Sequence, residues 1–450
     1  MSITVAIAMY GWPVLSVFLF LCMPARRAAI SAVLGGWLLL PQGVVYQISG
    51  IPDYTRETAI FLGALIGLVI FDLGSVMRAK WGVWDLPIAV WCLSPLPSSI
   101  TNGLGVYDGL SGVLEQLVIY GTPYLIGRCH FAHPLRLGEM SMAVIAAALL
   151  YLPLFLIELR LGPVFHKLVY GYEHFKWHMV WRLGWYRPPV FLSHGITLGM
   201  WLSTGLLLAC WLWRSGFPGR PLRLSVGLAS LAIGASLVAS RAMNGWGVFV
   251  CCFGTLLAGA ATRTRWWLVV LALIPAIYVG SRVVLNWEAT PIVEQVSKLN
   301  ADRAASLRSR IAHEVLLIDH ALERPIFGWG TYNRNRPVIE ADDSPEGMMG
   351  NRSITDSLWI IALGQRGLVG LVGIGGVLVL PSLLAGLRVP VKMWRTPEFG
   401  PVMATAAICS GFAFDGLFNA MYTPVAFLGA GAVLGILRRP MATHGKGGGA

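Results

Sequence analysis

The sequence has little charge for its length. Only 12% of its 450 residues are Asp, Glu, Lys or Arg, whereas 56% are hydrophobic. A typical soluble protein has about twice that share of charged residues, which it needs to cover its surface. The shortage of charge therefore excludes an ordinary soluble fold and predicts a chain whose solvent is largely lipid.

Cysteine is also scarce, and its spacing excludes two kinds of site. The seven cysteines include no Cys-x-x-Cys pair and no Cys/His cluster. A zinc site or a disulfide framework would need such groupings. We expect the cysteines to pack as small hydrophobic residues, and we expect no metal and no cofactor.

The positive charge is not arranged as in a nucleic-acid-binding protein. The formal net charge is +12, from 34 Lys and Arg against 22 Asp and Glu. The basic residues lie in short connections between apolar runs, as in the cytoplasmic loops of membrane proteins. No basic and aromatic platform for a single strand accompanies them. We therefore expect the lipid bilayer as a partner and no nucleic acid.

Long apolar runs make up most of the chain. Thirteen are long enough to cross about 30 Å of hydrocarbon. They lie at about residues 3–23, 28–49, 57–77, 84–103, 109–127, 139–159, 190–213, 222–240, 244–261, 265–284, 357–386, 400–418 and 420–438. The fourth is the weakest, because Pro95 and Pro97 interrupt it. The runs predict an all-α, polytopic membrane protein with about 12–13 transmembrane helices.

Basic residues occur at every second connection between these runs. The connections hold Arg26-Arg27, Arg78/Lys80, Arg128/Arg136, Arg214/Arg220/Arg223, Arg263/Arg265, Arg388/Lys392/Arg395 and Arg438-Arg439. The positive-inside rule assigns all of them to the cytoplasm. We therefore expect the N-terminus outside and the C-terminus inside, with a cytoplasmic tail at 439–450.

The remaining connections include two long outer loops. Residues 1–284 would hold the first ten transmembrane helices, with an outer loop at about 159–189. Residues 285–355 would form a large outer loop, and residues 356–438 the last helices. Within the large loop, residues 301–325 have the pattern of an amphipathic helix. Its apolar face would consist of Leu307, Ile311, Val315, Ile318 and Leu322.

Ionisable residues in or beside the apolar runs gather toward the outer side. Glu115, Glu158, Arg241, Asp356 and Asp415 all have this position. Asp72 and Asp85 are inner-side exceptions, close to basic connections that can pair with them. Charges inside a membrane are costly, so they are usually paired or functional. Their one-sided distribution predicts a polar cavity that opens outward rather than a continuous path across the membrane.

The outer loops add further cations. Arg182, Arg187 and His194 belong to the first loop and the helix after it, and Arg308 and Arg310 to the second. The guanidinium fork suits a phosphate or diphosphate ligand. Arg308 and Arg310 are two positions apart, so a regular helix points them about 200° apart. The alternatives are anchoring at the lipid headgroups and pairing of Arg310 with Glu314.

Several short motifs surround these residues. They are Ser240-Arg241, Arg308-x-Arg310-Ile311, Ala321-Leu322-x-x-Pro325, Gly328-Trp329-Gly330, Thr355-Asp356-Ser357-Leu358-Trp359, Gly367-Leu368-Val369-Gly370, Pro123-Tyr124-Leu125-Ile126-Gly127-Arg128 and Asp415-x-x-x-Asn419. Together with the many spans and the large loop before the last helices, they resemble the O-antigen ligase and O-antigen polymerase superfamily of bacterial envelope proteins. The architecture is similar over most of the chain, and the motifs mainly over 241–370.

The resemblance implies a glycosyltransferase of the bacterial inner membrane with its large loop in the periplasm. Such proteins take a sugar chain from undecaprenyl diphosphate and transfer it to a sugar hydroxyl. By resemblance, Arg241 and one of Arg308 and Arg310 hold the diphosphate. Candidate catalytic residues are Asp356, Arg241 and Arg310, and candidate substrate-binding residues are Arg308, Arg182, Arg187, His194, Glu115, Trp329 and Asp415.

One departure bears on the type of transferase. Ligase relatives carry a His near the start of the span after the large loop, where this chain has Asp356. An aspartate beside an arginine stays ionised at neutral pH and can act as a base. The change favours a polymerase or an exopolysaccharide-type transferase over a lipid A–core ligase.

Two other functional classes stay open. A transporter or flippase of lipid-linked saccharides would need a hydrophilic path to the cytoplasmic side, which the charge distribution does not favour. A non-catalytic scaffold for envelope assembly would tolerate loss of Asp356 and the arginines. The expected partners are a polyprenyl-diphosphate-linked oligosaccharide, a saccharide acceptor and other polysaccharide-assembly membrane proteins.

Overall fold

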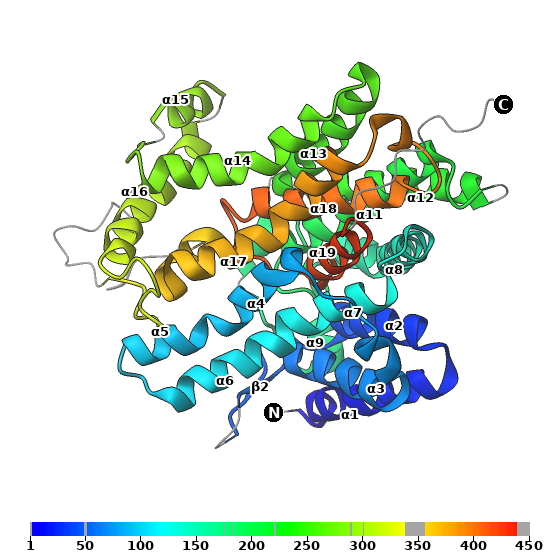
Figure 1. Cartoon of the computed structure of the whole chain (residues 1–450), viewed down its shortest axis with the longest axis horizontal. Helices are drawn as coiled ribbons and strands as arrows, with labels where there is room; N and C mark the ends of the chain where they lie inside the picture. The colour runs from blue at the N-terminus through cyan, green and yellow to red at the C-terminus, as the bar shows by residue number, and fades with distance from the viewer. Residues whose placement is uncertain are drawn as a thin grey trace, which may run out of the picture.

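The protein folds almost entirely into helices, as the computed structural model in Figure 1 shows. The structure describes residues 2–48, 52–175, 177–182, 184–219, 222–288, 290–299, 301–337 and 356–438. Strands in these ranges are limited to two short antiparallel pairs, β1 (Val45–Tyr46) with β2 (Tyr54–Thr55) and β3 (Trp181–Arg182) with β4 (Trp185–Tyr186).

Eight helices in the described ranges are long and apolar enough to cross a membrane. They are α1 (Ile3–Cys22), α3 (Arg56–Met77), α8 (Pro134–Leu161), α11 (Gly195–Ser215), α12 (Leu222–Ser240), α13 (Met243–Thr262), α14 (Trp266–Val283) and α17 (Leu358–Arg388). Each coincides with one of the thirteen apolar runs. The prediction of an all-α, multi-pass membrane protein is confirmed.

The other five runs form shorter or interrupted helices. Three are single helices, α2 (Ala25–Leu39), α18 (Gly400–Asp415) and α19 (Pro424–Ile436). The fourth run divides into η1 (Val83–Asp85), α4 (Leu86–Leu93) and α5 (Pro95–Thr101). Pro95 has no amide hydrogen, and the Ser94 hydroxyl donates to the Trp91 carbonyl in its place. The fifth continues from α6 (Val106–Gln116) through the π-turn η2 (Leu117–Gly121) into α7 (Thr122–His130).

The centre of the bundle depends on close helix contacts. Nearly every residue of α18 is buried, and Figure 1 shows this helix among α11, α13, α17 and α19. Helices α7 and α19 approach so closely that a side chain at Gly127 would overlap the backbone of Leu428, and one at Gly431 that of Tyr124. In lipid, such backbone contact provides the van der Waals energy that drives helices together.

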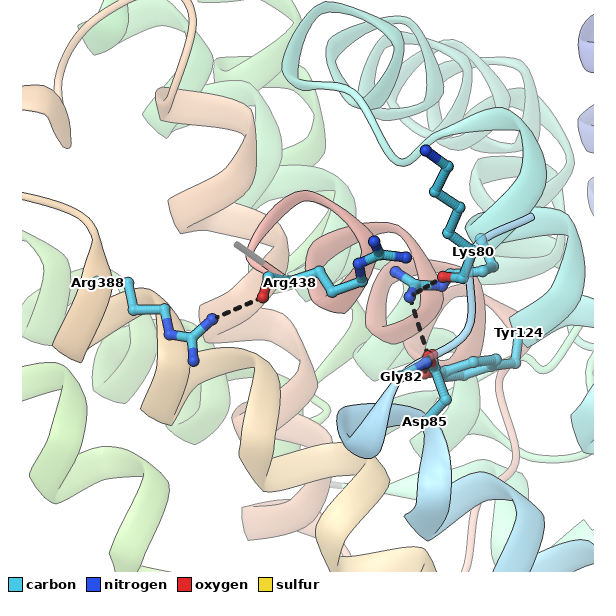
Figure 2. A network of polar contacts seen from close by, with 7 residues as sticks. Lys80, Gly82, Asp85, Tyr124, Arg388 and Arg438 are labelled. Carbon is cyan, nitrogen blue, oxygen red and sulfur yellow. Dashed lines mark hydrogen bonds and ion pairs between the residues drawn. The ribbon is translucent and has the colours of Figure 1, made fainter. Parts of the chain in front are cut away.

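The connections lie at two ends of the bundle. Helix α17 runs between the ends over 31 residues, with a break at Gly367. At its start, the Leu358 amide donates to the Asn419 carbonyl. At its end, the Arg388 guanidinium donates to the carbonyls of Leu437 and Arg438, as Figure 2 shows for Arg438. We call these the loop end and the basic end.

Each end joins connections that the sequence assigns to one side of the membrane. At the loop end, the Arg324 guanidinium donates to Asn102 Oδ1 at 2.6 Å, and that of Arg310 donates to the Phe418 carbonyl at 3.2 Å. At the basic end, Arg128 donates to the Lys80 carbonyl at 2.6 Å. The alternation of connections along the sequence is therefore matched by contacts in space.

The described part of the large loop contains two helices, α15 (Thr290–Leu299) and α16 (Ala301–Leu322). The residues after α16 dock on the break in α17, where the Trp329 amide donates to the Gly364 carbonyl at 2.8 Å. Gly328 and Gly367 both have positive φ, and a side chain on either would overlap the other segment's backbone. The acidic stretch from Glu340 to Glu346 lies outside the described residues.

Helix α16 confirms the predicted helix, but its buried face differs from the predicted one. Leu317, Ile318 and Ala321 are buried against α17, whereas Val315 and Leu322 are 41% and 38% exposed. The face is rotated because Glu314, one turn before Leu317 and Ile318, is drawn inward by the Arg282 guanidinium, at 3.4 Å.

The shorter segment between α8 and α11 also has a defined fold. It contains α9 (Phe165–Tyr170) and α10 (Trp177–Val180), and the Glu158 carboxylate accepts the amides of Val164, Phe165 and Val190 at 2.8–3.0 Å. A further short helix, η4 (Val391–Met393), lies at the basic end. Glu158 therefore organises the backbone that leads into α11.

Candidate functional site

Four of the predicted site residues line one cavity at the loop end. The cavity encloses about 360 Å³, within the range of small-ligand sites. Its polar wall consists of Arg187, Arg241, Arg310, Asp415, Asn244 and Asn419, and its apolar wall of Ile196, Met243, Gly247, Val248, Phe414 and Phe418. We call it the arginine cavity.

Arg241 occupies the tight turn between α12 and α13. Its φ of 54° lies in the left-handed region, which costs a residue other than glycine about 1–2 kcal/mol. Such strain is commonly found at functional sites, where the surrounding structure holds it in place. The Arg241 guanidinium also lies over the ring of Trp185, 5.7 Å from its centroid. The turn therefore fixes this cation at the mouth of the cavity.

Arg310 reaches the cavity from α16. Its guanidinium donates to the Phe418 carbonyl at 3.2 Å and lies 3.7 Å from the Asp356 carboxylate. The two side chains of this ion pair are 41% and 48% exposed, so the pair contributes little to stability. Asp356 is therefore next to Arg310, which lines the cavity, but does not itself line the wall.

Asp415 provides the carboxylate of the cavity wall. It ends α18 and is 4% exposed. Its Oδ1 accepts hydrogen bonds from the amides of Asn419 at 2.8 Å and Asn244 at 3.3 Å. No hydrogen bond to Oδ2 is formed within the described residues. The carboxylate is therefore oriented by one oxygen and has the other available.

Arg187 completes the cationic side of the cavity. It is 8% exposed, and its amide donates to the Val180 carbonyl at 2.6 Å. The wall therefore holds three guanidinium groups against one carboxylate. This excess of fixed positive charge, rich in N–H donors, suits an anion with several oxygens, such as a phosphate or diphosphate.

One side of the cavity faces the lipid-exposed surface of α13. Met243 and Gly247 line the cavity, and Met243 and Val250, on the same face of the helix, are 56% and 60% exposed. A side chain added at Gly247 would meet no other atom within 4 Å. The arginine cavity thus borders an exposed apolar face of α13.

Arg308 lies on the other side of α16. It lines a separate cavity of about 610 Å³ with Arg282, Glu294 and Asp319. The helix geometry therefore separates Arg308 from Arg310, as their spacing in sequence predicts. The alternative pairing of Arg310 with Glu314 is not formed. Glu314 instead contacts Arg282, Tyr278 and Ser357.

Two further predicted residues hold the local structure together. His194 caps α11, where its Nδ1 accepts the Ile196 amide at 3.1 Å, directly beside the cavity wall. The indole N–H of Trp329 donates to the His320 carbonyl at 2.7 Å, and Arg324 lies over its ring at 4.4 Å. Trp329 therefore fixes the turn after α16 and does not line the cavity.

The remaining two predicted residues lie apart from the cavity wall. Glu115 has an exposed side chain on α6. The backbone of Arg182 pairs with that of Trp185 in the short sheet. The side chain of Arg182 is outside the described part of the structure. Trp185 itself contacts Arg241, so the sheet reaches the site through its second strand.

Two side-chain amides that were not selected from the sequence complete the site. Asn419 appeared only within a motif, and Asn244 was not considered. For Asn419 the available signal was spacing, since it follows Asp415 by four residues, about one helical turn, and side chains so placed commonly interact. Asn244 has no such signal, because its carboxylate partner Asp415 is distant in sequence.

The described residues contain no group of three or more His, Cys, Asp or Glu side chains placed to hold a metal ion. No known protein family matches the chain, and no curated protein is significantly similar to it in sequence. A functional assignment therefore rests on the arginine cavity and the chemistry that its residues can perform.

Proposed function

We propose that this protein is a membrane-embedded glycosyltransferase that polymerises or ligates polysaccharide repeat units from an undecaprenyl-diphosphate donor. The observation that carries the proposal is the arginine cavity, which has three cations and one carboxylate and borders an exposed apolar face of α13. A lipid diphosphate needs both kinds of surface, one for its phosphates and one for its hydrocarbon chain.

The arginines would act on the leaving group. In the transfer, the acceptor hydroxyl oxygen bonds to the anomeric carbon, the bond from that carbon to the diphosphate oxygen breaks, and the polyprenyl diphosphate leaves with the electron pair. Fixed cations stabilise the charge that develops on the diphosphate. Arg241 and Arg310 are the proposed diphosphate ligands, and Arg187 adds a third cation to the same polar wall.

A carboxylate would accept the proton of the attacking hydroxyl. The sequence predicts Asp356 for this role, and the cavity offers Asp415 as a second candidate. Asp415 has the position in the wall and an oxygen without a hydrogen-bond partner among the described residues, whereas Asp356 contacts Arg310. Separate substitutions to Asn distinguish them, since only the base is needed for the proton transfer.

The exposed apolar face of α13 supports a lipid-linked donor over a soluble one. A polyprenyl chain lying along Met243, Gly247 and Val250 would stay in hydrocarbon while its diphosphate entered the cavity. The basic connections at the opposite end of the bundle favour the periplasmic side of a bacterial inner membrane for the loop end.

The test is transfer by the purified protein in lipid nanodiscs. The donors are lipid-linked saccharides extracted from the source cells, and mass spectrometry follows their loss and the growth of the glycan. We expect elongation or ligation with wild-type protein and a loss of at least about 100-fold with Arg241→Gln. Binding or movement of the saccharide without a new glycosidic bond would overturn the proposal and favour a carrier.

A further inference from the structure

A second cavity, at the basic end, is lined by five cationic side chains. It encloses about 600 Å³ and lies between the end of α3, the end of α7, the start of α8 and the end of α19. The cations are Arg78, Lys80, Arg128, Arg136 and Arg438. No carboxylate lines the cavity within the described residues. We call it the basic-end cavity.

One of the five cations is neutralised by a buried aspartate. Arg128 lies 2.9 Å from the Asp85 carboxylate, which also accepts hydrogen bonds from the Tyr124 hydroxyl at 2.6 Å and the Gly82 amide at 2.7 Å (Figure 2). All three donors are thus committed to Asp85. Arg128 serves as a rigid part of the wall, because both partners of this pair are almost completely buried.

The aspartate on α3, Asp72, is also occupied. Asp72 accepts a hydrogen bond from the Ser75 hydroxyl at 2.7 Å and lies 3.7 Å from His130 Nε2. In Figure 2 the ammonium group of Lys80 extends away from Asp85. The side chains of Arg78, Lys80, Arg136 and Arg438 therefore have no carboxylate partner among the described residues. Four like charges around one concavity repel one another unless an anion occupies it.

Two features of the chain near the end of α19 shape the wall of the basic-end cavity. The Arg438 carbonyl accepts a hydrogen bond from Arg388, which fixes the last turn beside the cavity. A side chain at Gly435 would collide with the Arg128 guanidinium and with Ala132. Glycine at this position therefore leaves room for the guanidinium in the cavity wall.

The end of α3 also has an exposed apolar face. On it, Ile70, Leu73 and Met77 are 62%, 45% and 78% exposed. The cavity itself is lined by Ser75 of the same helix and by Arg78 and Ala79, which directly follow it. Basic pockets between membrane helices bind anionic lipid headgroups.

We propose that the basic-end cavity is a binding site for a phosphate-bearing anion, held by Arg78, Lys80, Arg136 and Arg438 against the fixed Arg128–Asp85 pair. The guanidinium groups of three of these residues match the oxygens of a phosphate. The site is independent of the proposed transferase activity, which takes place at the other end of the bundle. The phosphate belongs either to a lipid headgroup or to a soluble phosphate compound.

The test compares two charge-matched double variants of the full-length protein. Arg78→Gln/Arg136→Gln removes two cations from the cavity. Arg27→Gln/Arg263→Gln removes two exposed cations from other connections of the basic end. Native mass spectrometry in neutral detergent measures binding of phosphatidylglycerol and phosphatidylcholine, and calorimetry measures binding of inorganic pyrophosphate.

The cavity variant should bind the anionic probe at least about tenfold more weakly, and the control variant should stay within about twofold of wild type. Loss of phosphatidylglycerol binding identifies a lipid headgroup, and loss of pyrophosphate binding identifies a soluble phosphate compound. Equal effects of the two double variants, or no preference of wild type for either anion over phosphatidylcholine, would overturn the proposal.

A milder variant keeps the test decisive if the first does not fold. Arg78→Lys/Arg136→Lys retains both charges and loses only the two-pronged geometry. It should weaken binding of the same probe by about threefold, because an ammonium group cannot bind phosphate through two parallel hydrogen bonds. Unchanged binding in this variant, where the first variant is not folded, would contradict the assigned ligands.

Discussion

Replacing Arg310 by Gln removes one cation from the arginine cavity with little disturbance of the fold. The guanidinium contacts only the Phe418 carbonyl and the half-exposed Asp356 carboxylate in the described part of the chain. A surface pair of this kind is worth about 0–1 kcal/mol. The variant should therefore fold and unfold within a few degrees of the wild-type protein.

The effect on transfer should be much larger. A hydrogen bond from a charged group contributes about 1.5–3 kcal/mol. Because each factor of ten in rate corresponds to about 1.36 kcal/mol, losing the contact to the diphosphate lowers kcat/KM by about 10- to 150-fold. If the contact forms fully only as the leaving group departs, kcat carries most of this loss.

The matched comparison is Arg308→Gln, two residues away on the same helix. Arg308 lines the other cavity, so its charge acts on the arginine cavity only through screened, longer-range attraction. We expect a loss below about threefold. Transfer kinetics in nanodiscs and thermal unfolding are measured for both variants. Equal losses of kcat/KM in two folded variants would refute the assignment of the Arg310 face to the diphosphate.

Three further outcomes are expected. Gly247→Leu should raise the KM for the lipid-linked donor by about tenfold by obstructing the side of the cavity that borders α13, whereas Gly11→Leu, on α1, should not; both positions open on free space, so neither substitution should disturb packing. Gly245→Ala should lower stability by about 1–3 kcal/mol in thermal or denaturant unfolding, because its Cβ would lie 2.5 Å from the Gly199 carbonyl oxygen. A loss no larger than that of Gly247→Ala would contradict this close contact. Burial lowers the pKa of His174 to about 4 from its usual 6.5, so the unfolded chain binds the proton more tightly. The contribution of neutral His174 to the free energy of unfolding should be complete above pH 6.5 and decrease as the pH is lowered toward 4. The free energy of unfolding of His174→Gln should therefore depend less on pH over this interval.

The physical basis of the His174 prediction lies in its two ring nitrogens. Nε2 is hydrogen-bonded to the Leu192 carbonyl at 3.0 Å, whereas Nδ1 is buried and has no hydrogen-bond partner within the described residues. Protonation would therefore place an unpaired N–H in the interior, next to the ring of His166 at 4.1 Å. If the free energy of unfolding depended on pH in the same way for wild type and His174→Gln, the prediction would be contradicted, and the ring would be hydrated in the folded protein.

The pattern of spans could be read from the sequence because it depends on local properties. A run of about 20 apolar residues must be satisfied in lipid by its own backbone hydrogen bonds, wherever it packs. The interruption near Pro95 was also predictable, since a proline removes an amide hydrogen regardless of its neighbours. The π-turn before α7 has no such local signal.

The separation of Arg308 from Arg310 was likewise fixed by sequence spacing, because a regular helix turns by 100° per residue. Which of the two would face Arg241 was not. That choice depended on the rotation of α16 against α17, set by the burial of Leu317 and Ile318 and by the Arg282–Glu314 pair. The predicted apolar face of α16 differed for the same reason.

By itself, the sequence determined that the protein lies in a membrane, how its apolar runs alternate with basic connections, and that cations collect at one side. Only the tertiary structure decided that Arg187, Arg241, Arg310 and Asp415 meet in one cavity, while Glu115 and Trp329 do not. Local patterns specify the helices, whereas the site arises where four segments distant in sequence pack together. That packing depends on close contacts between helices, which no single segment records.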